Sequence, residues 1–109
     1  MKRGEIWFAD SGRGGDRPVL VLTRDPVADR IDAVVVAQLT TTVRGLMSEL
    51  PLGAADGLKR DCVASFDNLH TLQRSAFRRR VAVLSADRMD AACSVMNDAL
   101  GCGSLGLGR

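Results

Sequence analysis

The sequence predicts a small, mainly β protein in which a strongly curved sheet or partly open barrel is followed by one C-terminal helix. Three observations lead to this prediction. Apolar residues gather in five or more short runs, rich in valine and leucine and separated by polar or glycine-containing turns, which is typical of strands. Helical periodicity occurs in one late stretch. The length of 109 residues suits a single domain with one modest core.

The first half of the chain contains three predicted strands. Glu5–Asp10 has β-branched and aromatic content, and we expect Trp7 to be a core or interface aromatic, with base stacking as the alternative. Val19–Thr23 is apolar throughout and follows Pro18, which cannot donate a ladder hydrogen bond and therefore suits the first residues of a strand. Asp32–Leu39 is the strongest strand pattern in the chain.

The second half adds shorter strands. Glu49–Leu52 is interrupted by a proline, which predicts an edge strand. Asp61–Phe66 runs on into the polar segment 67–71. Val81–Leu84 is predicted as the last strand, behind the basic run Arg78–Arg80, for which a solvated face and a nucleic-acid edge are both open.

The predicted helix begins after Ser85, a favourable N-cap, and has Asp87 near the positive end of its dipole. Gly101 is placed to end it. Its apolar stripe predicts a packing surface, formed by Met89, Ala92, Cys93, Met96, Ala99 and Leu100. Residues 102–109 are glycine-rich and predict a loose tail on a single domain that spans 1–109.

Composition limits the classes of function. The net charge of +2 is too small to imply nucleic-acid binding by itself, so local basic clusters matter more than the total. The three cysteines lack zinc-type or redox-type spacing, and we expect no metal, no cofactor and no disulfide framework. Without a signal peptide or a membrane-spanning run, the expected location is the cytoplasm.

The stretch around Arg17 is the main candidate for chemistry. A glycine-rich turn, 11–16, leads directly into this arginine and the apolar run that follows. A guanidinium held at the mouth of a rigid strand can grip a phosphate through two donors. The alternative is an arginine that merely caps the barrel edge in solvent.

A run of three threonines, 40–42, follows the strongest strand. A threonine hydroxyl can donate to a phosphate oxygen, whereas the plainer interpretation is a polar strand end.

The ordered set of segments resembles the MazF/PemK/Kid family of toxin endoribonucleases. The resemblance runs from Lys2 to about Leu100 and is carried by four pieces in the family's order. They are Arg3-Gly4-Glu5-Ile6-Trp7, Gly15-Asp16-Arg17-Pro18-Val19-Leu20-Val21-Leu22, Val36-Ala37-Gln38-Leu39-Thr40-Thr41, and Asp61-Cys62-Val63 with Asp67-Asn68-Leu69-His70-Thr71-Leu72. It implies an SH3-like (CcdB/PemK-type) barrel of about five to seven strands with a C-terminal α-helix.

The resemblance also implies a function. It points to metal-independent, sequence-specific cleavage of single-stranded RNA by a cytoplasmic homodimer that a cognate antitoxin inhibits. Arg17 matches the arginine of the family's Arg-Pro-Val stretch, Thr40 matches the threonine after its third main strand, and Asp67 with Asn68 matches its acidic–amide pair. The predicted catalytic residues are therefore Arg17, Thr40 and Asp67.

Further residues are predicted to contact RNA. They are Arg13, Asp16, Thr41, Arg44, Asn68 and His70. The general base stays open among Asp16, Asp67 and His70, because His70 stands where relatives often have arginine or lysine and the loop before Arg17 lacks the glutamate that some members carry. Ser65 stands where some have arginine.

Two rival functions remain. CcdB toxins resemble this fold but bind gyrase without catalysis, through a C-terminal Trp-Gly-Ile segment. This chain has no tryptophan after Trp7 and retains Arg17 and Thr40, which favours the nuclease. A barrel that binds RNA or protein without cutting is the second rival.

Overall fold

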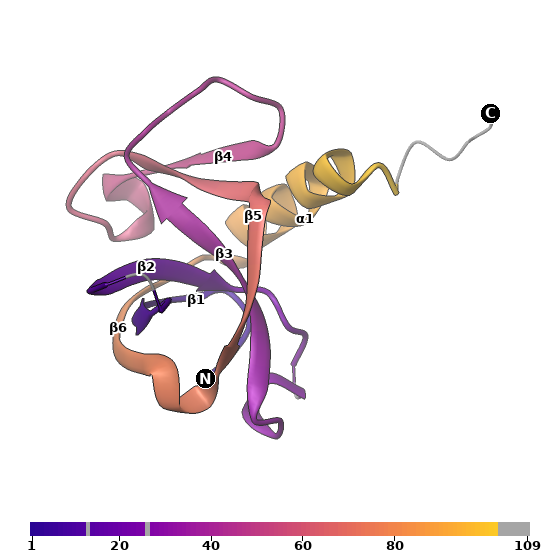
Figure 1. The fold of residues 1–109 in the computed structure, drawn as a ribbon. Coiled ribbons are helices and arrows are strands. Elements are labelled where there is room, and N and C mark those ends of the chain that lie inside the picture. The colour runs from indigo at the N-terminus through magenta and orange to yellow at the C-terminus, as the bar shows by residue number, and fades with distance from the viewer. Residues whose placement is uncertain (13, 26, 103–109) are drawn as a thin grey trace.

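The computed structural model describes residues 1–12, 14–25 and 27–102. Its elements are, in chain order, β1 (Glu5–Asp10), β2 (Asp16–Val21), the 3-10 turn η1 (Val27–Asp29), β3 (Ala33–Thr40), β4 (Glu49–Leu52), η2 (Ala54–Asp56), β5 (Cys62–Gln73), η3 (Arg74–Ala76), β6 (Phe77–Val83) and α1 (Ala86–Leu100). The strands form one antiparallel sheet in the order β4-β5-β3-β2-β1-β6, which curls round on itself (Figure 1). The predicted mainly β fold with a C-terminal helix is confirmed.

Strand alternation gives the sheet two faces with separate apolar clusters. The helix-side core is made of Ile6, Leu20, Leu22, Ala37, Leu39, Leu50, Leu52, Ala64, Phe66, Leu84 and Ala92. The second core, on the other face, is made of Ala9, Val19, Val21, Ala28, Val34 and Val36. Because neighbours along a strand point to opposite faces, β2 and β3 contribute to both cores. Each fully buried valine or leucine contributes about 1.5–3 kcal/mol relative to exposure.

The helix α1 covers the helix-side core, as its sequence pattern predicts. The Ser85 hydroxyl oxygen accepts a hydrogen bond from the Arg88 backbone N–H at 3.2 Å, which caps the first turn. Gly101 ends the helix with φ of 74°, a left-handed conformation that favours glycine. Met89 and Met96 pack against the helix-side core. The stripe is therefore a packing surface.

The predicted start of the second strand is wrong. β2 begins at Asp16, which pairs with Asp10 on β1, rather than at Val19. Its ladder with β3 starts only at Val19. Pro18 therefore lies where the strand is paired on one side only, and its missing N–H leaves the sheet intact.

The predicted start of the last strand is also wrong, because β6 begins at Phe77 and includes all three consecutive arginines. Charged residues are tolerated there because β6 is an edge strand. Their contacts are Arg78 with Asp10 and Asp16 (3.7 and 3.8 Å), Arg79 over the Phe8 ring (4.8 Å to its centroid) and Arg80 with Glu5 (3.1 Å). The basic run therefore fastens the edge strand to its neighbours.

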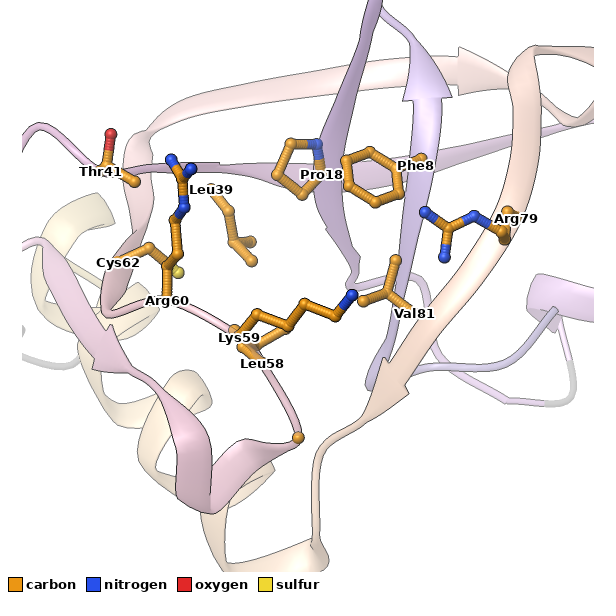
Figure 2. A pocket seen from close by; sticks show the side chains of 11 residues that line it. Phe8, Pro18, Leu39, Thr41, Leu58, Lys59, Arg60, Cys62, Arg79 and Val81 are labelled. Carbon is orange, nitrogen blue, oxygen red and sulfur yellow. The ribbon is translucent and has the colours of Figure 1, made fainter.

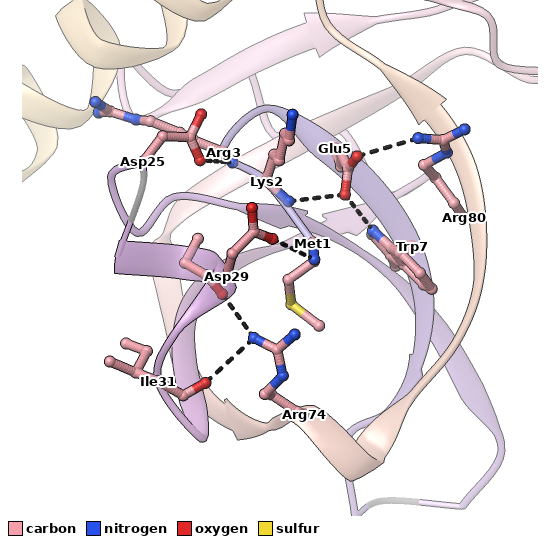
Figure 3. Close-up of polar contacts among 11 residues, drawn as sticks. Met1, Lys2, Arg3, Glu5, Trp7, Asp25, Asp29, Ile31, Arg74 and Arg80 are labelled. Carbon is pink, nitrogen blue, oxygen red and sulfur yellow. Dashed lines mark hydrogen bonds and ion pairs between the residues drawn. The ribbon is translucent and has the colours of Figure 1, made fainter.

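Glu5 is the centre of a buried polar cluster that joins the N-terminus to β6 (Figure 3). Its carboxylate accepts hydrogen bonds from the Lys2 backbone N–H (2.8 Å), Trp7 Nε1 (3.0 Å) and Arg80 Nη1 (3.1 Å). Burial alone would raise the pKa of Glu5, but these hydrogen bonds outweigh it and the pKa lies below its ordinary value. The Trp7 ring meets Phe77 edge to face. Trp7 therefore packs inside the fold.

Candidate functional site

A shift in strand register brings the acidic–amide pair to the surface. Ala37 pairs with Leu69 on β5, but the next residue, Gln38, pairs with Ser65. The three intervening residues, 66–68, are left without partners on β3, and β5 turns sharply (Figure 1). Phe66 turns into the core, whereas Asp67 and Asn68 are exposed.

A hollow of about 370 Å³, here called the polar hollow, lies beside this turn. It unites the end of β3, the following loop, the start of β4 and the turn of β5. Its lining residues are Gln38, Thr40, Thr42, Arg44, Leu46, Glu49, Ser65, Asp67 and Asn68. The structure thus brings together Thr40, Arg44, Asp67 and Asn68, which are four of the residues predicted from the sequence.

Arg17 lies next to the polar hollow in the order of the sheet. The last β2–β3 pair is Val19 with Gln38, and continuing this register by two residues brings Arg17 level with Thr40 and on the same face, although the strands are no longer paired there. Arg17 is exposed, and in the described part of the chain its side chain forms no hydrogen bond or ion pair. Its donors are therefore available to a ligand.

The two neighbouring threonines point in different directions. The Thr40 hydroxyl oxygen accepts a hydrogen bond from the Thr42 backbone N–H at 3.1 Å, which fixes its rotamer and leaves its proton to donate. Thr41 instead lines a second hollow. The structure does not place Thr41 with Thr40, because adjacent strand residues face opposite sides of the sheet.

Gln38 is a site residue that the sequence reasoning missed. Its side-chain oxygen lies 3.3 Å from Asn68 Nδ2 and 3.3 Å from His70 Nε2. These two contacts hold the Gln38 side chain beside Asn68 and His70. The available signal was spacing: Gln38 precedes Thr40 by two residues and so shares its face of the strand.

The loop between β3 and β4 is held by Glu49, which the sequence suggested only as a strand residue. Its buried carboxylate accepts hydrogen bonds from the backbone N–H groups of Arg44, Gly45 and Leu46 at 3.1, 2.9 and 3.2 Å. The Ser48 hydroxyl donates to the Asp67 carboxylate. These contacts fix the outer wall of the polar hollow and the backbone of Arg44.

Two predicted RNA contacts lie elsewhere. Asp16 starts β2 and lies 3.8 Å from Arg78 Nε, in a loose and half-exposed ion pair. It precedes Arg17 and therefore faces the other side of the sheet. Arg13 lies outside the described residues.

The second hollow, here called the apolar hollow, has a volume of about 490 Å³ and lies on the opposite face of the sheet (Figure 2). Its charged lining residues are all cations: Lys59, Arg60 and Arg79. Its remaining lining residues are Phe8, Pro18, Leu39, Thr41, Gly57, Leu58, Cys62 and Val81. Burial, followed by the nearby carboxylates of Asp56 and Asp61, raises the pKa of the Cys62 thiol.

The described residues form neither a metal-binding cluster nor a membrane-spanning helix. Within the described ranges, no three His, Cys, Asp or Glu side chains cluster closely enough to hold a metal ion. None of the helices described is both long and apolar enough to cross a membrane.

Comparison with known proteins agrees with this geometry. Residues 2–100 match the family of PemK-like, MazF-like toxins of type II toxin–antitoxin systems. The chain belongs to this family. The resemblance to this family found in the sequence is thereby confirmed.

Individual relatives and solved structures are similar to the chain over most of its length. The chain is 60% identical over 103 residues to the probable endoribonuclease MazF2 of Mycobacterium tuberculosis, which covers 94% of this chain and all of the relative. The solved structure of the Mycobacterium tuberculosis toxin MazF-mt6 superimposes with a TM-score of 0.82 at 36% identity, covering 89% of this chain and 96% of that one. A mycobacterial endoribonuclease in complex with its cognate antitoxin matches with a TM-score of 0.84 at 25% identity, covering 94% and 96%.

Proposed function

We propose that this protein is an endoribonuclease toxin that cuts single-stranded RNA at specific sequences, without a metal ion. One observation carries the proposal: Arg17 is exposed, forms no hydrogen bond or ion pair in the described part of the chain, and lies on β2 two residues from the pair that joins this strand to Gln38 in the polar hollow. The names of the relatives, among them the endoribonuclease EndoA of Bacillus subtilis, support the same activity. The match to the PemK-like, MazF-like family favours the nuclease over a CcdB-like gyrase inhibitor.

The reaction that suits these residues is attack by the ribose 2′-hydroxyl on the adjacent phosphorus. The 2′-oxygen–phosphorus bond forms and the bond to the 5′-oxygen breaks, which gives a cyclic 2′,3′-phosphate and a 5′-hydroxyl. Arg17 stabilises the negative charge that builds on the phosphoryl oxygens, and the Thr40 hydroxyl donates a hydrogen bond to one of them. A single positioned donor of this kind is worth roughly 2.7–4 kcal/mol.

Asp67 is the best placed of the three candidate bases. It lines the polar hollow, and the Ser48 hydroxyl holds one of its carboxylate oxygens. Asp16 faces the other side of the sheet beside Arg78. His70 Nε2 is engaged with the Gln38 side-chain oxygen, and His70 is not among the residues that line the polar hollow.

We extend the proposal to an antitoxin that binds at the apolar hollow. Apolar walls surrounded by cations suit an acidic peptide segment with an apolar anchor, which orders as it binds.

We also propose a two-fold homodimer. The apolar residues of the helix and the Trp7 ring pack largely against the chain's own two cores, so they do not supply the dimer surface. Three exposed apolar side chains instead cluster on the loop between β3 and β4, where Val43, Leu46 and Met47 are 60%, 47% and 69% exposed. A second copy would cover this self-complementary patch.

The experiment that tests the activity is end-sequencing of RNA incubated with purified protein and excess chelator. Cleavage should proceed, and the products should carry cyclic phosphate and 5′-hydroxyl ends. A substrate with 2′-deoxyribose at the scissile position should stay intact. Activity that depends on an added divalent ion, or cleavage of the deoxy substrate, would refute the mechanism.

A further inference from the structure

We infer that Gln38 is a specificity-determining residue that reads the edge of one unstacked RNA base bound in the polar hollow. The inference rests on the proposed RNA cleavage and assigns a role to a residue outside the predicted catalytic and RNA-contacting set. Two observations carry it. Gln38 lines the polar hollow two residues before Thr40, and hydrogen bonds hold its side-chain amide.

The position puts Gln38 within one nucleotide of the proposed reaction. It is half-buried, lines the polar hollow and precedes Thr40 by two residues on the same face of β3. Its pairing with Val19 on β2 and Ser65 on β5 sets it in the middle of the sheet, where backbone motion is small. A base that enters the hollow while its phosphate contacts Arg17 and Thr40 would meet this side chain.

The charges of the hollow favour a base over a phosphate. Two carboxylates, Glu49 and Asp67, line it together with one arginine, Arg44. Glu49 is held by three backbone N–H groups, and the Ser48 hydroxyl holds Asp67. A phosphate inside the hollow would be repelled by these carboxylates, whereas the amide side chains of Gln38 and Asn68 suit a base edge.

The amide of Gln38 is held ready for such an edge. Asn68 Nδ2 donates to its oxygen at 3.3 Å and His70 Nε2 lies 3.3 Å from the same oxygen, which fixes the orientation of the amide. Both N–H bonds of its Nε2 have no partner within the described ranges. The Asn68 side-chain oxygen likewise has no partner there and can accept a hydrogen bond. Gln38 thus offers a donor beside the acceptor of Asn68, and little side-chain freedom is lost on binding.

This arrangement discriminates between RNA bases, because a base with the wrong edge leaves polar side chains of the hollow without hydrogen-bond partners. A base that presents an acceptor to Gln38 and a donor to Asn68 satisfies both side chains. A base with the reverse pattern would leave both amides without partners, which is costly. A residue with only a structural role would instead affect all RNA sequences equally.

The test is cleavage of an RNA library randomised around the scissile site, with the wild-type protein, Gln38→Ala and Gln38→Glu. Gln38→Glu keeps an oxygen next to Asn68 and His70, replaces the donor group by an acceptor and adds one negative charge. Gln73→Ala is the matched control, since Gln73 is an exposed glutamine at the far end of β5. We expect both Gln38 variants to lose about tenfold or more of the preference at one nucleotide, with the other positions unchanged. Gln73→Ala should keep the wild-type profile.

The outcomes separate the two proposals. Wild-type protein that cleaves, with the same base preference in both Gln38 variants, would overturn the role of Gln38 and leave the proposed function standing. A uniform loss of cleavage across all sequences in both variants would also overturn it. Wild-type protein that cleaves nothing would overturn the proposed function itself. If Gln38→Ala melts early, Gln38→Glu, with nearly the same shape, still decides the question.

Discussion

The polar hollow and the apolar hollow differ sharply in chemistry, although adjacent residues at the end of β3 and just after it help to build both. Gln38 and Thr40 line the first, whereas Leu39 and the following Thr41, which comes directly after the strand, line the second. The polar hollow carries charges of both signs, whereas the charged residues that line the apolar hollow are all cations. A period of two residues in a single strand thus lets a small sheet present one surface suited to RNA chemistry and another suited to an acidic partner.

The largest expected effect comes from the arginine beside the polar hollow. Arg17→Ala should slow RNA cleavage by about 100-fold or more, because the charge on the phosphoryl oxygens loses its fixed donor. Antitoxin affinity should stay nearly unchanged. Arg24→Ala is the matched control, since Arg24 is an exposed arginine just beyond the same strand. Initial rates on a fluorescent RNA measure the effect, and melting curves check the fold. A wild-type rate in Arg17→Ala would remove the centre of the proposed mechanism.

The opposite pattern is expected at the apolar hollow. A double substitution, Lys59→Glu with Arg79→Glu, should weaken binding of the cognate antitoxin by about tenfold or more, because like charges would face an acidic segment. Cleavage of RNA in the absence of antitoxin should change less than about twofold. Calorimetric titration supplies the affinity. If cleavage is lost while antitoxin affinity persists, the two hollows have been assigned the wrong way round.

The neighbouring threonines give the sharpest comparison, since they differ by one position in sequence and by one face in space. Thr40→Ala should reduce cleavage by about tenfold, the effect of losing one hydrogen bond to a charged group. Thr41→Ala should leave the rate within about twofold. Single-turnover kinetics on one RNA decides between them. Equal losses would mean that the alternation of the strand does not separate the two surfaces.

The strand pattern made much of the fold predictable. A β-branched and aromatic run gave β1 and a valine-rich run gave β3, each to within a residue, and the proline placed β4 at an edge. The start of β6 was missed because three arginines hide a strand whose charges are held by contacts with β1 and the start of β2. Such contacts join residues about 70 positions apart, and local pattern carries no information about them.

The candidate site was predictable only in part, for a related reason. Thr40 and Asp67 could be identified by resemblance, but their meeting depends on the register shift that exposes Asp67. Gln38 and Glu49 act through hydrogen bonds to residues on other segments or to backbone N–H groups. Nothing in their own sequence neighbourhood distinguishes them from ordinary strand residues.

The smallest expected effect concerns how β6, which carries one wall of the apolar hollow, is anchored. Glu5 holds Arg80 on this strand, and its pKa lies below its ordinary value of 4.5. The charged form is favoured in the folded state, so its stabilisation is present above the pKa of the unfolded chain and is lost as the pH falls through the lower, folded-state pKa.

Glu5→Gln should therefore lower the free energy of unfolding by about 1 kcal/mol at pH 7. The difference from wild type should shrink as the pH drops below 4.5. Urea unfolding at several pH values measures it, with Asp90→Asn on the exposed side of α1 as the control. A difference that stays constant down to pH 3 would show that the charge on Glu5 does not anchor the strand, and that its shape alone does.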